Sequence, residues 1–306
     1  MAKEITFKQL ADQWAGEKKR LVKHSTYCNY MLIVRMHLLP AFADYKAISE
    51  REAQQFTFDK IASGLSRKTV HDIIAVLRSI VKYGSKHYCF PPPDWEITYP
   101  TSTEKKQLPV LSIGDHRKLM KYLSENPTPK TIGIMLSLCT GMRIGEVCAL
   151  RWENVNLTRR IITVGQTAGR IYDVDKRATE RIISTPKTKN SNREIPIGTV
   201  LYKALCSLHK GSSGSYVIGN RDEASDPRTY REYFSRLLKR LGIQRIVFHG
   251  LRHTFATRCI ESKCDYKTVS AILGHSNIAT TLNLYVHPDI EQKKKCIDRM
   301  AKALGI

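Results

Sequence analysis

Three consecutive prolines, Pro91, Pro92 and Pro93, constrain this chain more than any other local feature. Proline fixes its own backbone and lacks an amide donor, so neither a regular helix nor a central strand passes through such a run. The segment that follows, 101–106, is polar and has no periodicity. We therefore expect the 306 residues to divide into a first domain at 1–90, a linker at 91–107 and a second domain at 108–306.

The first domain carries apolar residues at spacings of three and four, in Phe7, Leu10 and Trp14 and again from Val70 to Val81. This spacing gathers apolar side chains on one face of a helix. The sequence therefore predicts a small domain that is helical throughout.

The second domain combines helical patterns with three β-branched runs that suit one small antiparallel sheet. The predicted strands lie at 161–164, 181–185 and 193–197. The predicted helices lie at about 115–124, 131–140, 144–150 and 227–241, the last with Asp226 as its cap and Pro227 at its first position. The predicted fold is mostly α with a small antiparallel β-sheet, an α+β class.

The charge of the chain points to an anionic partner. Its 50 Lys and Arg against 28 Asp and Glu leave a net charge of +22, which favours DNA or RNA over a surface that is basic only for solubility or that meets acidic lipid. We expect the first domain to bind DNA through basic residues on its helices: Lys18, Lys19, Arg20, Lys23, Arg67 and Lys68.

Neither a membrane nor a disulfide framework is expected. No uninterrupted apolar run approaches 18 residues, which predicts a cytoplasmic, nucleoid-associated protein. The eight cysteines contain no CxxC pair, and Cys259 with Cys264 is the nearest approach to a metal spacing. The sequence predicts no metal and no other cofactor.

Four separated segments carry side chains suited to a phosphodiester. Arg143 follows a glycine that ends an apolar helix, Lys187 lies in a polar turn between two predicted strands, and His249 and Arg252 are three apart at a helix start. His275 closes a helix, and Tyr285 follows ten residues later. Arginine holds phosphate through a permanently charged fork, whereas a phenol is a nucleophile that needs activation.

Each segment alone also has an ordinary interpretation. Arg143 would be a surface arginine paired with Glu146, and Lys187 a solvated charge. The histidines near Arg252 would bind a metal, and Tyr285 would be one of fourteen structural tyrosines. The ordered set favours chemistry, because a binding module needs neither a nucleophile nor a proton donor.

In this order, Arg143, Lys187, His249-x-x-Arg252, Leu-Gly-His275 and Tyr285 resemble the tyrosine recombinase, or phage integrase, family. The resemblance covers essentially the whole chain and implies a helical core-binding domain followed by a catalytic domain. It implies a site-specific DNA recombinase, an integrase that forms a 3′-phosphotyrosyl link to Tyr285 without metal or ATP.

The resemblance also implies individual roles. Lys187 would be the general acid, with Lys189 on the same turn as the alternative and otherwise a DNA contact. His249 would assist proton transfer, and His275 would hydrogen-bond the scissile phosphate. The implied partners are double-stranded DNA at attachment or core sites and three further protomers in a tetramer, with room for an accessory DNA-bending or directionality factor. The tail at 288–306 has apolar residues at helical spacing and would dock on a neighbouring subunit or on its own domain.

Other functions stay open at this point. The same chemistry serves integration or excision of a mobile element, Xer-like dimer resolution, inversion, and a type IB topoisomerase-like reaction without partner exchange. A non-catalytic DNA-binding accessory factor is an alternative from a different class. A metal-dependent transposase is disfavoured, because Asp173 and Asp175 suit a turn or strand edge better than a carboxylate triad.

Overall fold

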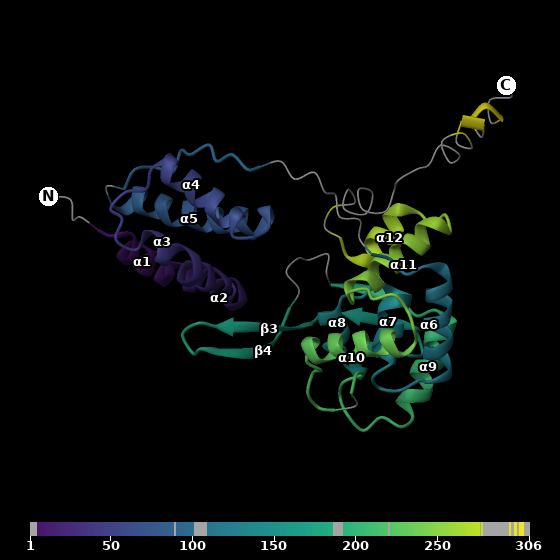
Figure 1. Cartoon of the computed structure of the whole chain (residues 1–306). Helices are drawn as coiled ribbons and strands as arrows, with labels where there is room; N and C mark the ends of the chain where they lie inside the picture. Colours follow the sequence, from purple (N-terminus) through teal and green to yellow (C-terminus); the bar gives the residue numbers. More distant parts are fainter. Residues whose placement is uncertain are drawn as a thin grey trace. The chain divides into compact units, whose positions relative to one another are not determined.

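The computed structural model describes residues 5–88, 90–100, 109–185, 192–219, 221–275, 277, 294, 297, 298 and 300–302. It separates into two compact units, each described here by itself (Figure 1). The first unit comprises Met1–Lys106 with Ile171–Glu180, and the second comprises Gln107–Arg170 with Arg181–Ile306.

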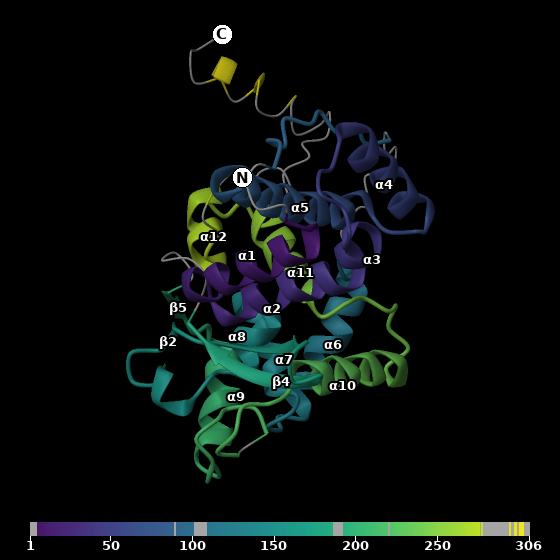
Figure 2. The same ribbon diagram turned by 90° about the vertical axis from the view of Figure 1, so that its left-hand side faces the viewer.

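The first unit is a bundle of helices that begin where the sequence supplies caps. Its elements are α1 (Phe7–Leu21), α2 (His24–Ile33), a π-helical turn η1 (Val34–Leu38), α3 (Leu39–Phe42), α4 (Glu50–Ala62) and α5 (Arg67–His87). Thr6 and Ser49 form reciprocal capping boxes with Gln9 and Glu52, which satisfy amides that have no partner inside the helix. α1 packs against α5 (Figure 2). The buried Trp14 indole donates to Ser79 Oγ at 3.1 Å.

The outer half of a β-hairpin also belongs to the first unit. The hairpin consists of β3 (Thr167–Asp173) and β4 (Ala178–Ser184), and its residues 171–180 group with the helices. Arg35 donates a hydrogen bond to the carbonyl oxygen of Val174 at 3.0 Å. Nothing in the sequence pattern predicts this grouping.

The second unit is built around α7, its most apolar helix. The unit contains α6 (Ile113–Glu125), α7 (Ile132–Thr140), α8 (Ile144–Cys148), the 3-10 turn η2 (Trp152–Asn154), α9 (Thr199–His209), α10 (Pro227–Arg240), α11 (His249–Glu261) and α12 (Tyr266–Leu273). Both views show α7 in the middle of this group, where α6, α8, α9 and α11 pack against it (Figures 1 and 2). Every residue of α7 except Cys139 is buried. This helix is therefore the centre of the hydrophobic core that supports the site.

The strands form two small antiparallel sheets instead of the single sheet expected. One sheet has the order β1-β2-β5, from β1 (Val155–Asn156), β2 (Ile161–Val164) and β5 (Arg193–Pro196), with Ile162 opposite Ile195. The predicted strand at 181–185 is part of β4, which pairs with β3 in the other sheet. No residue of β4 is buried, so this strand has no apolar face with which to join the core sheet.

The two predicted strands on either side of Lys187 do not pair with each other among the described residues. The strands on either side of it, β4 and β5, belong to different sheets. Lys187 and Lys189 themselves lie outside the described residues.

The predicted fold class is confirmed, since the described residues are mostly helical with small antiparallel sheets. Among them, no helix is both long and apolar enough to cross a membrane. Most of the predicted tail helix at 288–306 falls outside the described residues. Of its apolar positions, Ile297 and Met300 are described as helical and are 62% and 51% exposed in the single chain.

Candidate active site

The turn between α7 and α8 places the first arginine, and it requires glycine. Gly141 ends α7 in the left-handed conformation, with φ of +67°, and its amide donates to Ser137 O at 2.9 Å. A Cβ at this position would lie 2.6 Å from Leu273 Cδ2 and 2.7 Å from Phe255 Cδ1. The glycine therefore allows the turn and also lets α11 and α12 approach it closely.

Arg143 lies at the N-cap of α8, where Glu146 holds it at two points. Its backbone amide donates to Glu146 Oε2 at 2.9 Å, and its Nη1 donates to Glu146 Oε1 at 2.9 Å. The arginine side chain is 36% exposed, whereas that of Glu146 is 4% exposed. The Arg143 guanidinium is thus held by a buried carboxylate and remains partly accessible to a ligand.

Arg252 approaches the same place from α11, and its side chain is buried. Its Nη1 donates to Gly141 O at 2.8 Å, and its Nη2 donates to Leu273 O at 2.7 Å. Arg143 Nη1 also reaches Leu273 O, at 3.5 Å. The two arginines that the sequence predicts to act together therefore converge on one carbonyl oxygen at the end of α12.

The histidines gather around these arginines. The rings of His249 and His253, one turn apart on α11, meet edge to face with centroids 4.6 Å apart. Gly274 closes α12 with φ of +66°, and His275 follows it directly. His275 lies close enough to Arg252 and Arg143 for their charges to affect its titration.

Burial and positive charge keep these imidazoles neutral at pH 7. Burial, with the charges of Arg252 and Arg143, lowers the pKa of His249. Burial and the same two arginines, joined by His253 and Arg193, lower the pKa of His275 to about 4. The pKa of His253 is also lowered to about 4, by burial and then by His249 and Arg252. A neutral imidazole has one ring nitrogen that donates a hydrogen bond and one that accepts, so it can take part in proton transfer at a phosphate.

Sequence reasoning missed one arginine of the cluster. Arg193 begins β5 with a side chain only 6% exposed, and its Nη1 and Nη2 donate to the two oxygens of Glu146 at 3.1 and 2.9 Å. Its Nε donates to Ile272 O at 2.6 Å. Burial alone would raise the pKa of Glu146, but its hydrogen bonds and its proximity to Arg193 and Arg143 lower it. A charged residue at a strand start, facing no partner nearby in sequence, carries no signal of this role.

The structure thus brings together Arg143, His249, Arg252 and His275 from three separated segments. Tyr285, Lys187 and Lys189, which the sequence assigns to the same reaction, lie outside the described residues. Their roles stay predictions.

The basic residues predicted to bind DNA lie at helix ends in the first unit. Lys18, Lys19 and Arg20 occupy the last turn of α1, and Lys23 directly precedes α2. Arg67 and Lys68 begin α5, where Ser66 caps the helix by accepting from the Thr69 amide at 3.1 Å. Arg67 also lies over the Tyr99 ring, 5.5 Å from its centroid. The Ser66 hydroxyl therefore serves as a helix cap beside these two basic residues.

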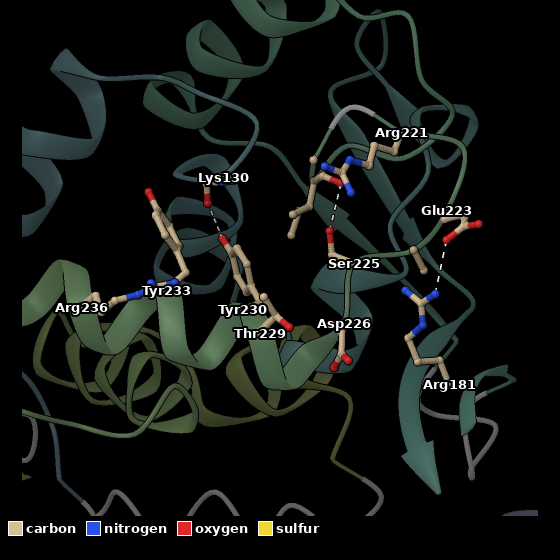
Figure 3. A pocket seen from close by; sticks show the side chains of 13 residues that line it. Lys130, Arg181, Arg221, Glu223, Ser225, Asp226, Thr229, Tyr230, Tyr233 and Arg236 are labelled. Atoms are coloured by element: carbon tan, nitrogen blue, oxygen red, sulfur yellow. Dashed lines mark hydrogen bonds and ion pairs between the residues drawn. The ribbon is translucent and has the colours of Figure 1, made fainter. Parts of the chain in front are cut away.

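A cavity of about 330 Å³ at the start of α10 contains none of the predicted site residues (Figure 3). Tyr230 projects into it from α10 and donates to the carbonyl oxygen of Lys130 at 2.6 Å, while Arg181 faces Glu223 at 3.4 Å. The Tyr230 hydroxyl and the Arg181 guanidinium in this cavity therefore already have partners within the protein.

Three side chains with metal-ligating atoms also meet among the described residues. One ligand atom from each of His24, Cys28 and Asp173 lies within 4.8 Å of the others. Asp173 Oδ1 already accepts the amides of Asp175 and Lys176 at 2.9 and 3.2 Å, and its other oxygen is 4.0 Å from the Lys176 ammonium. These contacts account for the carboxylate without a metal.

Comparison with known proteins shows which family the chain belongs to. The model of the phage integrase family matches residues 110–292, more than half of the chain. The chain belongs to the phage integrase family. A second model, of the SAM-like N-terminal domain of phage integrases, matches residues 6–57. The resemblance inferred from the ordered motifs is thereby confirmed, and members of this family are DNA strand-transferring enzymes.

Individual relatives of this integrase-family protein have low sequence identity, but they align with nearly its whole length. A XerC-like tyrosine recombinase of Caldanaerobacter subterraneus subsp. tengcongensis is 25% identical, with 97% of this chain and 83% of the relative covered. The ICEBs1 integrase of Bacillus subtilis is 22% identical, with 98% and 83% covered. The Tn1549 transposon integrase, solved in complex with transposon right end DNA, shares the fold with a TM-score of 0.81 at 22% identity, covering 97% of this chain and 100% of that one.

Proposed function

We propose that this protein is a site-specific DNA recombinase that cleaves and rejoins DNA through a 3′-phosphotyrosyl link to Tyr285. The observation that carries the proposal is the convergence of Arg143 and Arg252 on the carbonyl oxygen of Leu273, at 3.5 and 2.7 Å. Two guanidinium groups that approach one oxygen atom also suit the two non-bridging oxygens of one phosphate.

In the first step the Tyr285 oxygen forms a bond to phosphorus while the bond from phosphorus to the 5′-oxygen breaks. The tyrosine gives up its proton, and the leaving 5′-oxygen takes one. An ordinary phenol, with a pKa of about 10, is ionised in about one molecule per thousand at pH 7. The positive charges of Arg143 and Arg252 favour the phenolate and stabilise the charge that builds on the non-bridging oxygens.

The remaining polar residues divide the proton transfers. Lys187 protonates the 5′-oxygen, and Lys189 contacts the DNA backbone. His249 assists proton transfer at the phosphate, and His275 donates a hydrogen bond to it. The lowered pKa values of both histidines support these roles, because a neutral ring retains both a donor and an acceptor near pH 7.

The reaction is reversible without a supply of energy. The phosphotyrosyl ester replaces a phosphodiester of similar energy, so a 5′-hydroxyl from another strand attacks it and restores the DNA. The step requires no ATP and no metal.

The substrate is double-stranded DNA at specific core sites, held in part by Lys18, Lys19, Arg20 and Lys23 at the end of α1 and by Arg67 and Lys68 at the start of α5. Two duplexes need four strand cuts, so the active assembly is a tetramer on DNA, joined by an accessory DNA-bending or directionality factor where the system uses one. The tail at 288–306 docks on a neighbouring subunit. The protein acts in the cytoplasm, at the nucleoid.

The biological role we propose is integration and excision of a mobile element. Similarity to the ICEBs1 and Tn1549 integrases supports this role, while the similarity to a XerC-like recombinase supports dimer resolution as the second candidate. Joining two sites on separate circular DNA molecules, followed by release of the element, distinguishes integration from resolution of a dimer.

The test uses nicked duplexes that cover the DNA flanking the gene of this protein, without metal or ATP. A nick beside the cleavage site lets the short 5′-hydroxyl fragment diffuse away, which traps the covalent adduct. We expect wild-type protein to form an adduct that survives denaturing electrophoresis and Tyr285→Phe to form none.

Three results would contradict the proposal. An adduct formed equally by Tyr285→Phe would show that another residue is the nucleophile. DNA binding by both proteins with no adduct on any flanking duplex would favour a non-catalytic accessory factor. Relaxation of supercoiled DNA at many sites, without a joined product, would favour a topoisomerase-like enzyme.

A further inference from the structure

Arg193 connects two parts of the candidate site through a buried side chain. Two of its nitrogens donate to the two oxygens of Glu146 at 3.1 and 2.9 Å, and the third donates to Ile272 O at 2.6 Å. The side chains of Arg193 and Glu146 are only 6% and 4% exposed. A two-point ion pair in such surroundings has a fixed geometry.

The same carboxylate also holds Arg143. Glu146 Oε2 accepts the backbone amide of Arg143, and Oε1 accepts its Nη1, each at 2.9 Å. Glu146 therefore lies between two guanidinium groups, one buried and one 36% exposed. Any rotation of the carboxylate away from Arg193 would also move the Arg143 side chain.

Charge gives Arg193 a second effect on Arg143. If Glu146 faced Arg143 alone, the carboxylate would neutralise that guanidinium and compete with a phosphate for it. With Arg193 present, one negative charge is shared by two positive charges. Arg143 therefore keeps a net attraction for an anion on its exposed side.

Arg193 also fixes the backbone that leads to His275. Its bond to Ile272 O lies next to Leu273 O, the carbonyl oxygen that Arg252 and Arg143 approach. Gly274 and His275 follow directly. In sequence, Arg193 is six residues after Lys187.

We propose that Arg193 is a positioning residue for DNA cleavage, which orients Arg143 through Glu146, keeps its charge available to the scissile phosphate, and fixes the end of α12 ahead of His275. This inference rests on the proposed recombinase function. Arg193 does not touch the phosphate and acts only through its neighbours.

The experiment measures single-turnover cleavage of the nicked duplex, together with DNA affinity, for wild type and Arg193→Met. We expect the cleavage rate to fall by about 10²-fold while the affinity for DNA changes little, because a misplaced reacting group costs rate more than binding. Arg193→Lys, which keeps the charge but loses the two-point geometry, should cleave at an intermediate rate.

A double variant tests the route through Glu146. Arg193→Met leaves the carboxylate to neutralise Arg143 alone, whereas Arg193→Met with Glu146→Gln removes that negative charge. We expect the double variant to cleave faster than Arg193→Met. Arg170→Met is the matched control, because it breaks another arginine–carboxylate pair of the second unit, with Asp226, and should cleave at the wild-type rate.

A modified substrate separates positioning from a merely structural role. A methylphosphonate at the scissile position replaces one charged non-bridging oxygen by a methyl group, so cleavage depends less on the charge of Arg143. The ratio of wild-type to Arg193→Met rates should therefore be much closer to one on this substrate than on the phosphodiester.

Three outcomes decide the matter. If wild-type protein does not cleave, the proposed function fails, and the positioning role that rests on it fails too. If wild type cleaves and Arg193→Met cleaves equally fast, the positioning role is overturned. A rate loss of the same size on both substrates, with no gain in the double variant, would assign Arg193 to folding alone.

Discussion

Arg143 and Arg252 approach the same carbonyl oxygen but differ in what else they do for the protein. Arg252 is buried and donates to two backbone carbonyl oxygens, so it holds α7, α11 and α12 together as well as presenting charge. Arg143 is partly exposed and bonds mainly to Glu146, its neighbour on α8. Arg252 therefore contributes to both the fold and the proposed reaction, whereas Arg143 contributes mainly to the reaction.

Substituting the two arginines should separate these duties. We expect Arg143→Ala to lower the rate of adduct formation by about 10² to 10³-fold, the usual effect of removing one donor to a developing oxyanion, with little change in thermal midpoint. Arg252→Ala should lower both the rate of adduct formation and the thermal midpoint, because it removes the donor to the carbonyl oxygens of Gly141 and Leu273. Thermal melts and single-turnover cleavage give the two readouts. Wild-type cleavage by Arg143→Ala would show that its guanidinium does not meet the phosphate.

The buried histidine His253 should make stability depend on pH. Its pKa is about 4 in the folded protein and about 6.5 when unfolded, so between these values the unfolded chain binds a proton that the folded chain does not. The free energy of unfolding should therefore fall as pH decreases from 6.5 towards 4, by about 1–2 kcal/mol at pH 5 for this histidine.

Urea denaturation at pH 7 and pH 5 measures this loss. His253→Asn should lose less stability than wild type over the same interval. His275, with a pKa also of about 4, contributes in the same direction and remains in both proteins. An equal loss in the variant and in wild type would show that His253 is not protonated on unfolding.

At the scale of elements, α7 ends at Gly141 in close contact with α11 and α12, so this position should be sensitive to substitution. Gly141→Ala would place a methyl group 2.6 Å from Leu273 Cδ2 and force a left-handed backbone on alanine. We expect a loss of about 1–3 kcal/mol in the free energy of unfolding and a slower cleavage, since the turn also positions Arg143. Gly165→Ala, with no atom within 4 Å of its Cβ, is the control and should match wild type in both assays.

The sequence predicts an element when the pattern that marks it lies within a short stretch of the chain. The apolar run of α7, the Asp226–Pro227 start of α10 and the β-branched run of β2 lie within single short windows, and all three were predicted. The pairing of β4 with β3 was missed, because strand pairing depends on tertiary contacts that no short window contains.

The site shows the same division. Arg143, His249, Arg252 and His275 could be chosen because they stand in ordered motifs next to glycines or at helix starts. Arg193 could not, since its partners Glu146 and Ile272 are distant in sequence and nothing in its own segment marks it as buried.

At the scale of the whole molecule, the net charge of +22 predicts DNA binding that depends steeply on salt. Each phosphate contact contributes about 0.9 to the slope of log affinity against log salt concentration. Replacing Arg67 and Lys68 by Gln should make that slope shallower by about 2. Replacing Lys82 and Lys86, farther along the same helix, removes the same charge and should leave the slope unchanged. Equal slopes for the two double variants would show that the start of α5 is not a DNA contact.

The excess of arginine over carboxylate at the candidate site has a consequence for the enzyme away from DNA. At this site Glu146 pairs with both Arg143 and Arg193, while Arg252 donates to the carbonyl oxygens of Gly141 and Leu273. The folded protein therefore carries mutual repulsion that an incoming phosphate relieves, and any ligand that binds only the folded form raises its stability. We expect the protein without DNA to be digested faster by an added protease than the protein bound to its target duplex.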